Sequence, residues 1–158
     1  MAGGLISMKT EQDAINALKK VHFLERTEEL AKKYRRIPNG KKISTPRKDK
    51  VFGIIKKFGY IARFSFNRYE LRTDDSNGIR YKIAFEFYYN WVQFYFRFQE
   101  DGGTVYCGAW WRMKRAVAGD EDYHTGSPAS TSYEDLEKII GEAIKIYEDA
   151  AKALYEEN

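Results

Sequence analysis

This chain is poor in the residues that cross-link a fold, bind metal or interrupt helices. Its 158 residues include a single cysteine, Cys107, together with two histidines and three prolines. One cysteine cannot close an intramolecular disulfide, and its place in an apolar alternation predicts a small buried side chain. His22 and His124 have no second histidine or cysteine at ligand spacing, which excludes the usual zinc motifs. We therefore expect a cytoplasmic chain that folds without disulfide or metal.

Long apolar runs and catalytic signatures are also missing. No stretch approaches the ~18 to 20 apolar residues of a membrane-spanning helix. No GxSxG, P-loop or GxGxxG pattern occurs, and Asn39-Gly40-Lys41-Lys42 lacks the leading glycine of a phosphate loop. We expect no enzyme, no cofactor and no membrane association. Any catalytic reading would depend on the acidic loop at 120–133, which contains His124.

Charge is divided along the chain, although the net charge is only +4. Residues 9–58 carry 15 Lys/Arg against 6 Asp/Glu, residues 59–115 carry 9 against 6, and residues 116–158 carry 3 against 11. Such a division is typical of a nucleic-acid surface at the basic end, or of two ends that pack together and cancel. The sequence leaves both arrangements open.

The pattern of apolar residues predicts a single α+β domain over 9–158, preceded at 1–8 by a disordered start, either appended or upstream of Met8. A basic helical part is expected at 9–58, opened by a capping box of Thr10 and Asp13. A sheet is expected at 60–115. An acidic helix, capped by Thr131 and Ser132, follows at 131–155 and packs on the sheet.

The sheet is predicted to be a four-stranded antiparallel meander. Its strands are expected at 60–72, 79–88, 91–99 and 104–115. A two-residue loop between the second and third strands pairs Phe87 with Val92, and a four-residue loop after the third pairs Phe98 with Val105. The first hairpin pairs Phe66 with Phe85 and Phe64 with Phe87, and it leaves Arg68 and Glu70 at the rim of the apolar side.

The alternation also defines a second sheet face, which is too charged to bury easily and too aromatic for ordinary solvent exposure. We predict that this face binds a partner, because Trp, Tyr and Arg dominate interface hot spots and can stack on nucleic-acid bases. A competing structural interpretation is that the amphipathic helical segment 10–35 covers this face. The residues of the predicted binding face are Tyr88, Trp91, Tyr95, Arg97, Tyr106, Trp110 and Arg112.

Two charged segments are further candidates for binding. The basic linker could follow a phosphate backbone or lie in solvent, and the acidic helix could present carboxylates to a basic groove on a partner. The residues of the linker are Arg35, Arg36, Lys41, Lys42, Arg47 and Lys48, and those of the acidic helix face are Glu134, Asp135, Glu142 and Asp149.

These features favour a stoichiometric protein-binding protein. Our hypothesis is a bacterial or phage inhibitor, immunity or anti-defence protein, with an anti-CRISPR-like role among the options. Such a protein docks on and blocks a larger protein, for example one that handles nucleic acid. The alternative is a single-stranded RNA- or DNA-binding module that uses the aromatic and arginine face and the basic linker.

Overall fold

The computed structural model describes residues 8–35, 45–73, 80–89, 91–100 and 103–156. In this part of the chain there are five helices and five strands. They are α1 (Glu11–Lys20), α2 (Phe23–Lys33), α3 (Lys48–Lys57), β1 (Ile61–Ser65), β2 (Arg68–Arg72), β3 (Ile83–Tyr88), β4 (Trp91–Glu100), β5 (Gly103–Ala109), α4 (Trp110–Ala118) and α5 (Tyr133–Tyr155). The α+β class is confirmed, with five antiparallel strands in place of the predicted four.

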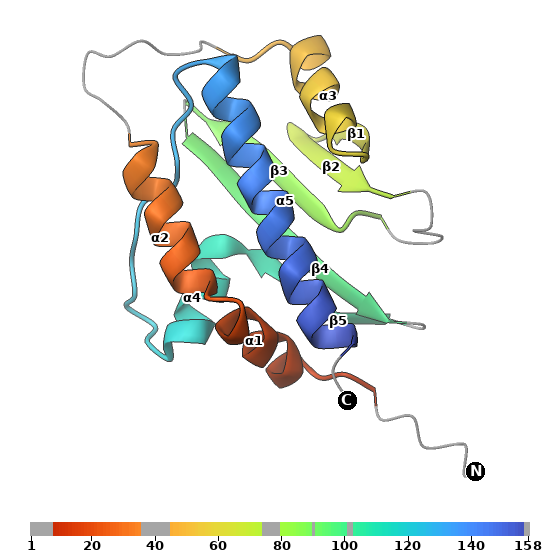
Figure 1. The fold of residues 1–158 in the computed structure, drawn as a ribbon, viewed down its shortest axis with the longest axis vertical. Coiled ribbons are helices and arrows are strands. Elements are labelled where there is room, and N and C mark those ends of the chain that lie inside the picture. The colour runs from red at the N-terminus through yellow and green to blue at the C-terminus, as the bar shows by residue number, and fades with distance from the viewer. Residues whose placement is uncertain (1–7, 36–44, 74–79, 90, 101–102, 157–158) are drawn as a thin grey trace.

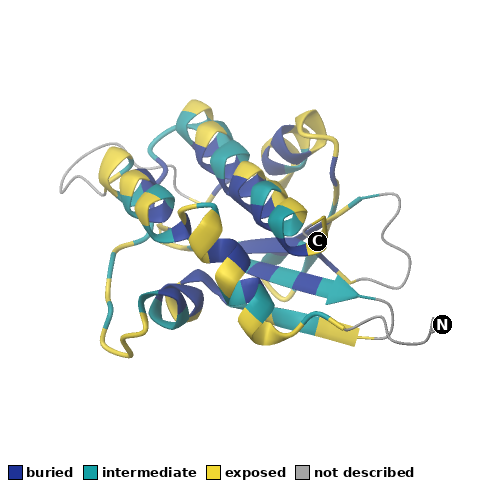
Figure 2. Ribbon diagram, turned by 60° about the horizontal axis from the view of Figure 1, so that its bottom comes forward, coloured by how far each residue is buried: buried dark blue, intermediate teal, exposed yellow. Residues whose placement is uncertain are grey.

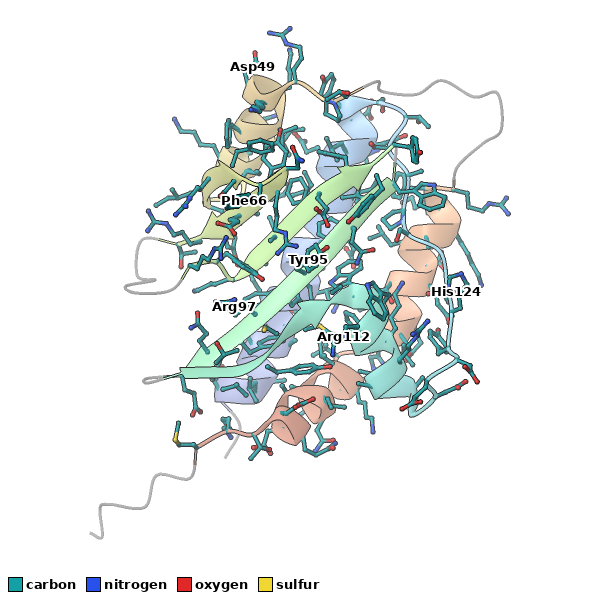
Figure 3. The ribbon with its side chains drawn as sticks, turned by 180° about the vertical axis from the view of Figure 1, so that it is seen from behind. Asp49, Phe66, Tyr95, Arg97, Arg112 and His124 are labelled. Carbon is teal, nitrogen blue, oxygen red and sulfur yellow. The ribbon has the colours of Figure 1, made fainter. Side chains whose placement is uncertain are left out.

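The strands form a meander in the order β1-β2-β3-β4-β5. Helix α5 crosses one face of this sheet, with α3 beside it near β1 and the α1-α2 pair on its other side (Figure 1). Viewed from behind, no described helix crosses β3 and β4, and α4 lies beside β5 (Figure 3). The alternative in which the segment 10–35 covers the second face is therefore wrong, and we call this uncovered side the open sheet face.

The core lies between the sheet and α5. Apolar residues of α5 recur at helical spacing and pack on the inward-facing phenylalanines of β3 and β4, which supplies most of the apolar burial. Figure 2 shows these buried positions repeating along α5. Gly141 leaves room for the ring of Phe58, since a Cβ there would lie 2.8 Å from its tip. Among the described residues no helix is long and apolar enough to cross a membrane.

The predicted first strand is in fact two strands. Phe66 and Asn67 both have left-handed backbone angles and form a tight turn between β1 and β2. Phe66 is therefore 90% exposed instead of facing Phe85, and it is Tyr69 that pairs with Phe85. This change of register also places Arg68 and Glu70 on the open sheet face, so their predicted position on the apolar side is wrong.

The hairpin of β3 and β4 has the predicted register, with Phe87 opposite Val92. The next hairpin does not, because a shift between Phe98 and Gln99 brings Phe98 opposite Tyr106. A slip of one residue moves each side chain of a strand to the other face. Cys107 is therefore exposed, against the prediction that it is buried.

The predicted fourth strand also ends early. The chain leaves β5 at Ala109 and continues as α4, whose buried residues follow helical spacing. Trp110 is consequently 3% exposed and packs on Phe94, with 4.6 Å between the ring centroids. Its assignment to the exposed binding face is wrong, whereas its neighbour Trp111 is 48% exposed.

The predicted capping box of Thr10 and Asp13 is present, and of the two predicted caps of the last helix Ser132 is the N-cap while Thr131 is not. The hydroxyl of Thr10 accepts a hydrogen bond from the Asp13 amide, and the Asp13 carboxylate accepts one from the Thr10 amide. These hydrogen bonds lower the pKa of Asp13. Ser132 caps α5 in the same way, by accepting from the amide of Asp135.

Candidate functional site: an aromatic groove at one end of the sheet

The centre of the open sheet face is a lattice of rings, guanidinium groups and carboxylates that engage one another. Figure 3 shows Tyr95 and Arg97 on this face. The guanidinium of Arg68 lies over the Tyr95 ring at 3.9 Å from its centroid, and that of Arg97 lies over Tyr81 at 4.6 Å. Tyr81 is buried and Tyr95 half-buried, so neither ring is free to stack on a ligand.

Carboxylates complete this lattice. Glu86 accepts hydrogen bonds from the hydroxyl groups of Tyr88 and Tyr95. Burial is the main cause of the raised pKa of Tyr95, and its hydrogen bond to Glu86 adds to the effect. At Tyr88 the main cause of the raised pKa is the hydrogen bond that its own hydroxyl donates to Glu86. Glu70, 1% exposed, forms an ion pair with Arg80 at 3.0 Å. Contacts within the protein therefore occupy much of the centre of the predicted binding face, although both carboxylate oxygens of Glu70 and Nε of Arg97 are buried without a hydrogen bond among the described residues.

Exposed aromatic side chains gather instead at the end of the sheet where β3 turns into β4. Tyr88 is 52% exposed, Tyr89 90% and Trp91 42%, and Trp111 of α4 lies in the same groove. We call these four residues the aromatic groove. It has a volume of about 1180 Å³ and is walled by α2, α4 and the segment 124–127.

The segment that follows α4 is held in place by backbone hydrogen bonds to β4 and to the C-terminal end of α2. The amide of Val92 donates to the carbonyl of Pro128, and the amide of Ala129 donates to the carbonyl of Tyr34. Trp91 forms an antiparallel bridge with Ala129. These contacts fix one wall of the groove against β4 and α2.

Side chains of α4 hold the same segment from the inside. The ammonium group of Lys114 donates to the Thr125 hydroxyl at 2.9 Å and to the Gly126 carbonyl at 3.5 Å. Burial lowers the pKa of Lys114 to about 8. Arg115 donates from Nε to the carbonyl of Tyr123, and its guanidinium carbon lies 5.0 Å from the centroid of Trp111.

The charged groups that line the groove are mostly cationic. Lys32 of α2, Arg35 just after that helix and Arg115 of α4 contribute positive charge, and Glu28 is the acidic residue among the described residues of the lining. The carboxylate of Glu28 accepts a hydrogen bond from Tyr123, whose pKa is raised to about 12, chiefly by burial. The one acidic group on the groove wall is thus already engaged.

The structure separates the residues that sequence reasoning had grouped together. Tyr88 and Trp91 line the groove, while Tyr95 and Arg97 belong to the lattice at the centre of the open sheet face. Tyr106 and Arg112 instead line a smaller pocket beside α1, of about 380 Å³. Burial raises the pKa of Tyr106 in that position.

The charged segments are mostly engaged in local contacts. Arg47 forms an ion pair with Asp49, and Lys48 lies over the ring of Phe64. Of the other predicted linker residues, Arg35 lines the groove, whereas Arg36, Lys41 and Lys42 lie outside the described residues.

On the acidic helix, the four predicted side chains all have partners. Glu142 and Asp149 both form ion pairs with Arg26, and Glu134 forms one with Lys138. Asp135 accepts a hydrogen bond from the Thr131 hydroxyl. The acidic helix therefore packs in part against the basic end of the chain, as in the cancelling arrangement.

Sequence reasoning missed Tyr89 and Trp111. Tyr89 had been assigned to a loop, although an aromatic residue in a two-residue turn must project into solvent. For Trp111 the missed signal was the helical spacing of Trp110, Met113 and Val117, which predicts a buried stripe that excludes it.

Chemistry within the groove is limited by its residues. His124 is exposed on the segment beside α2 (Figure 3), and no hydrogen-bond partner for it occurs among the described residues. The described part of the chain contains no group of three or more His, Cys, Asp or Glu side chains that could hold a metal ion. The arrangement is suited to binding through rings and cations.

Fold and groove together define an antiparallel α+β protein with an exposed aromatic groove at one end of its sheet. No family model matches the chain, and no curated protein or solved structure is significantly similar to it. The function is therefore inferred from the residues of the groove.

Proposed function

We propose that this chain is a non-enzymatic, stoichiometric protein-binding protein of the inhibitor, immunity or anti-defence type. It docks on and blocks a larger protein through the aromatic groove. The observation that carries this proposal is the gathering of four exposed aromatic side chains, Tyr88, Tyr89, Trp91 and Trp111, around one groove. Exposed clusters of this kind mark interaction sites, and Trp and Tyr contribute most per residue at protein interfaces.

The groove is also preorganised. Its rings extend from strand ends and from a helix, and its wall at 124–129 is fixed by backbone hydrogen bonds to Tyr34 and Val92. A rigid binding surface loses less conformational entropy on association than a mobile one. Tyr and Trp add to this advantage because each has only two side-chain torsions to immobilise.

The acidic helix gives less support to this function than its sequence suggested. Because Arg26 neutralises Glu142 and Asp149, these carboxylates are not free to engage a basic partner. A nucleic-acid-handling enzyme remains a suitable class of target, but docking then depends on the aromatic groove.

A second candidate function is single-stranded nucleic-acid binding, with bases on the rings and phosphates on cations. The observation that favours it is the presence of Lys32, Arg35 and Arg115 in the same groove as the rings. A nucleic-acid complex would weaken steeply with salt and disappear after nuclease treatment.

The test is affinity capture from nuclease-treated bacterial lysate with wild-type protein and a Tyr89→Ala/Trp111→Ala variant, followed by mass spectrometry. We expect wild type to retain one protein stoichiometrically and the variant to lose it. Tyr155→Ala is the control, because Tyr155 is also exposed but bonds the carbonyl of Gln99, at the opposite end of β4 from Trp91. Equal capture by all three proteins, or none by wild type, would exclude this function.

A further inference from the structure

We propose that the aromatic groove takes an acidic protein segment that carries at least one aromatic or large aliphatic side chain. This inference rests on the proposed function and assigns the chemistry of the partner. It also reverses the expectation from sequence, in which an acidic helix faced a basic partner.

The cations of the groove lie beside its aromatic rings. Lys32 lies in the last turn of α2 and Arg35 two residues beyond its last residue, Lys33, so both cations lie at the C-terminal end of this helix and line the groove. Arg115 lies on α4 four residues after Trp111, and both line the groove. Positive side chains therefore border the aromatic rings from two different helices.

The acidic groups in and beside the groove already accept hydrogen bonds from tyrosine hydroxyl groups. Glu28 accepts the hydroxyl of Tyr123, and Glu86, next to the groove, accepts the hydroxyl groups of Tyr88 and Tyr95. No ion-pair partner for Lys32 or Arg35 occurs among the described residues. A ligand that matches the groove must supply carboxylates to these cations, because complementary potentials favour the correct partner.

Exposed aromatic rings lie between the cations of the groove. Trp91 and Trp111 are each nearly half exposed, and Tyr89 extends into solvent from the turn after β3. Surface of this kind is stabilised by contact with a ring or an aliphatic side chain that excludes water. Charge and rings together thus require a partner segment with both acidic and apolar residues.

Single-stranded nucleic acid fits these observations less well. Three cations line the groove, and one of them, Arg115, already lies over Trp111 and donates to Tyr123. Two described residues of the basic linker, Arg47 and Lys48, are engaged with Asp49 and Phe64 and do not extend the basic surface.

Three probes of equal length separate the alternatives. The first is a 12-residue peptide that alternates Glu or Asp with Phe or Leu, the second replaces each acidic residue with Lys, and the third is a 12-nucleotide oligo(dT). Tryptophan fluorescence reports binding, because none of the probes contains tryptophan. Indole N–H shifts in NMR spectra then assign the contact to Trp91 and Trp111, against buried Trp110.

We expect the acidic peptide to bind and to shift the indole signals of Trp91 and Trp111, while the lysine peptide does not bind. A Lys32→Gln/Arg35→Gln variant should weaken the acidic peptide roughly fivefold at low salt. The matched control is Lys145→Gln/Lys152→Gln, which removes two exposed cations from α5 and should leave affinity unchanged.

Three results would overturn this inference: equal binding of the lysine peptide, tighter binding of oligo(dT), or no binding of any probe. Its failure is distinct from failure of the proposed function. If a captured protein depends on Tyr89 and Trp111 but is retained by the Lys32→Gln/Arg35→Gln variant, the function stands and the acidic chemistry of the partner does not.

Discussion

At the scale of single residues, Lys114 is the most unusual side chain of the molecule. It is 4% exposed and replaces its lost hydration with hydrogen bonds to Thr125 and Gly126. Burial disfavours the charged form of an amine, so the pKa of Lys114 falls from 10.5 to about 8. The folded protein therefore favours the neutral amine of Lys114 more than the unfolded chain does.

This shift predicts a pH dependence of stability. Between pH 8 and pH 10.5 the unfolded chain, with the ordinary lysine pKa, binds more protons than the folded protein. The free energy of unfolding due to Lys114 therefore rises with pH in this window, by about 2 kcal/mol between pH 8 and pH 10. Urea unfolding of wild type and Lys114→Met at these two pH values checks it, because titrations common to both proteins cancel in the difference. A difference that does not change with pH would contradict it.

Trp110 and Trp111 are adjacent in sequence, but one is buried and the other is exposed. Trp110 packs on Phe23, Phe94 and Phe96, whereas Trp111 lines the groove. Strand alternation had placed Trp110 on the exposed face, but it is Trp111 that is exposed. The reason is the start of α4 at Trp110, which a pattern of alternating residues does not reveal.

At the scale of elements, the turn between β1 and β2 has an unusual composition. Two-residue hairpin turns with positive φ at both positions favour Asn-Gly, but here Phe66 and Asn67 have φ values of 53° and 63°. A bulky residue in the left-handed region costs about 1–2 kcal/mol because its Cβ approaches the following carbonyl oxygen. Phe66 recovers little by packing, since it is 90% exposed.

We therefore expect Phe66→Asn to stabilise the protein by about 0.5–1 kcal/mol, because Asn tolerates the left-handed region. The measurement is the midpoint of urea unfolding at constant slope. Phe66→Ala serves as the control, since it removes the ring without introducing a residue suited to this backbone. A lower midpoint for Phe66→Asn would show that the ring makes a stabilising contact absent from the described structure.

At the scale of the whole molecule, the divided charge of the sequence becomes an internal contact. The guanidinium of Arg26 in α2 donates to Asp149 at 2.9 Å and to Glu142 at 3.3 Å, both in α5. Lys57 and Glu137 form a second ion pair between the basic part and the acidic helix. The packing of α1 and α2 against α5 thus brings opposite charges together.

Replacing Arg26 tests this arrangement. Its side chain is 22% exposed and serves two carboxylates, so Arg26→Met should lower the free energy of unfolding by about 1 kcal/mol. The loss should shrink in 1 M salt, which screens the pairs. Arg47→Met is the control, because its ion pair with Asp49 is exposed on both sides and should contribute almost nothing. Equal losses for the two variants in chemical unfolding would refute the special role of Arg26.

Much of the architecture was accessible from local pattern. The helix caps at Thr10 and Ser132, the α+β class and the register of the β3-β4 hairpin follow from short-range rules that the structure satisfies. The groove was accessible only in part. Tyr88 and Trp91 were among the predicted binding residues, and the structure places both there.

What the sequence determined by itself was local: the helix caps at Thr10 and Ser132, the apolar alternation of β3 and β4 and the division of charge, each set by side chains a few residues apart. Tertiary structure decided which faces met. Three local features move side chains to the opposite face from the predicted one. They are the turn at Phe66, the register shift after Phe98 and the start of α4 at Trp110. Because strand faces alternate with a period of two, such small changes decide burial completely. They placed the aromatic groove at the end of the sheet, between segments far apart in sequence.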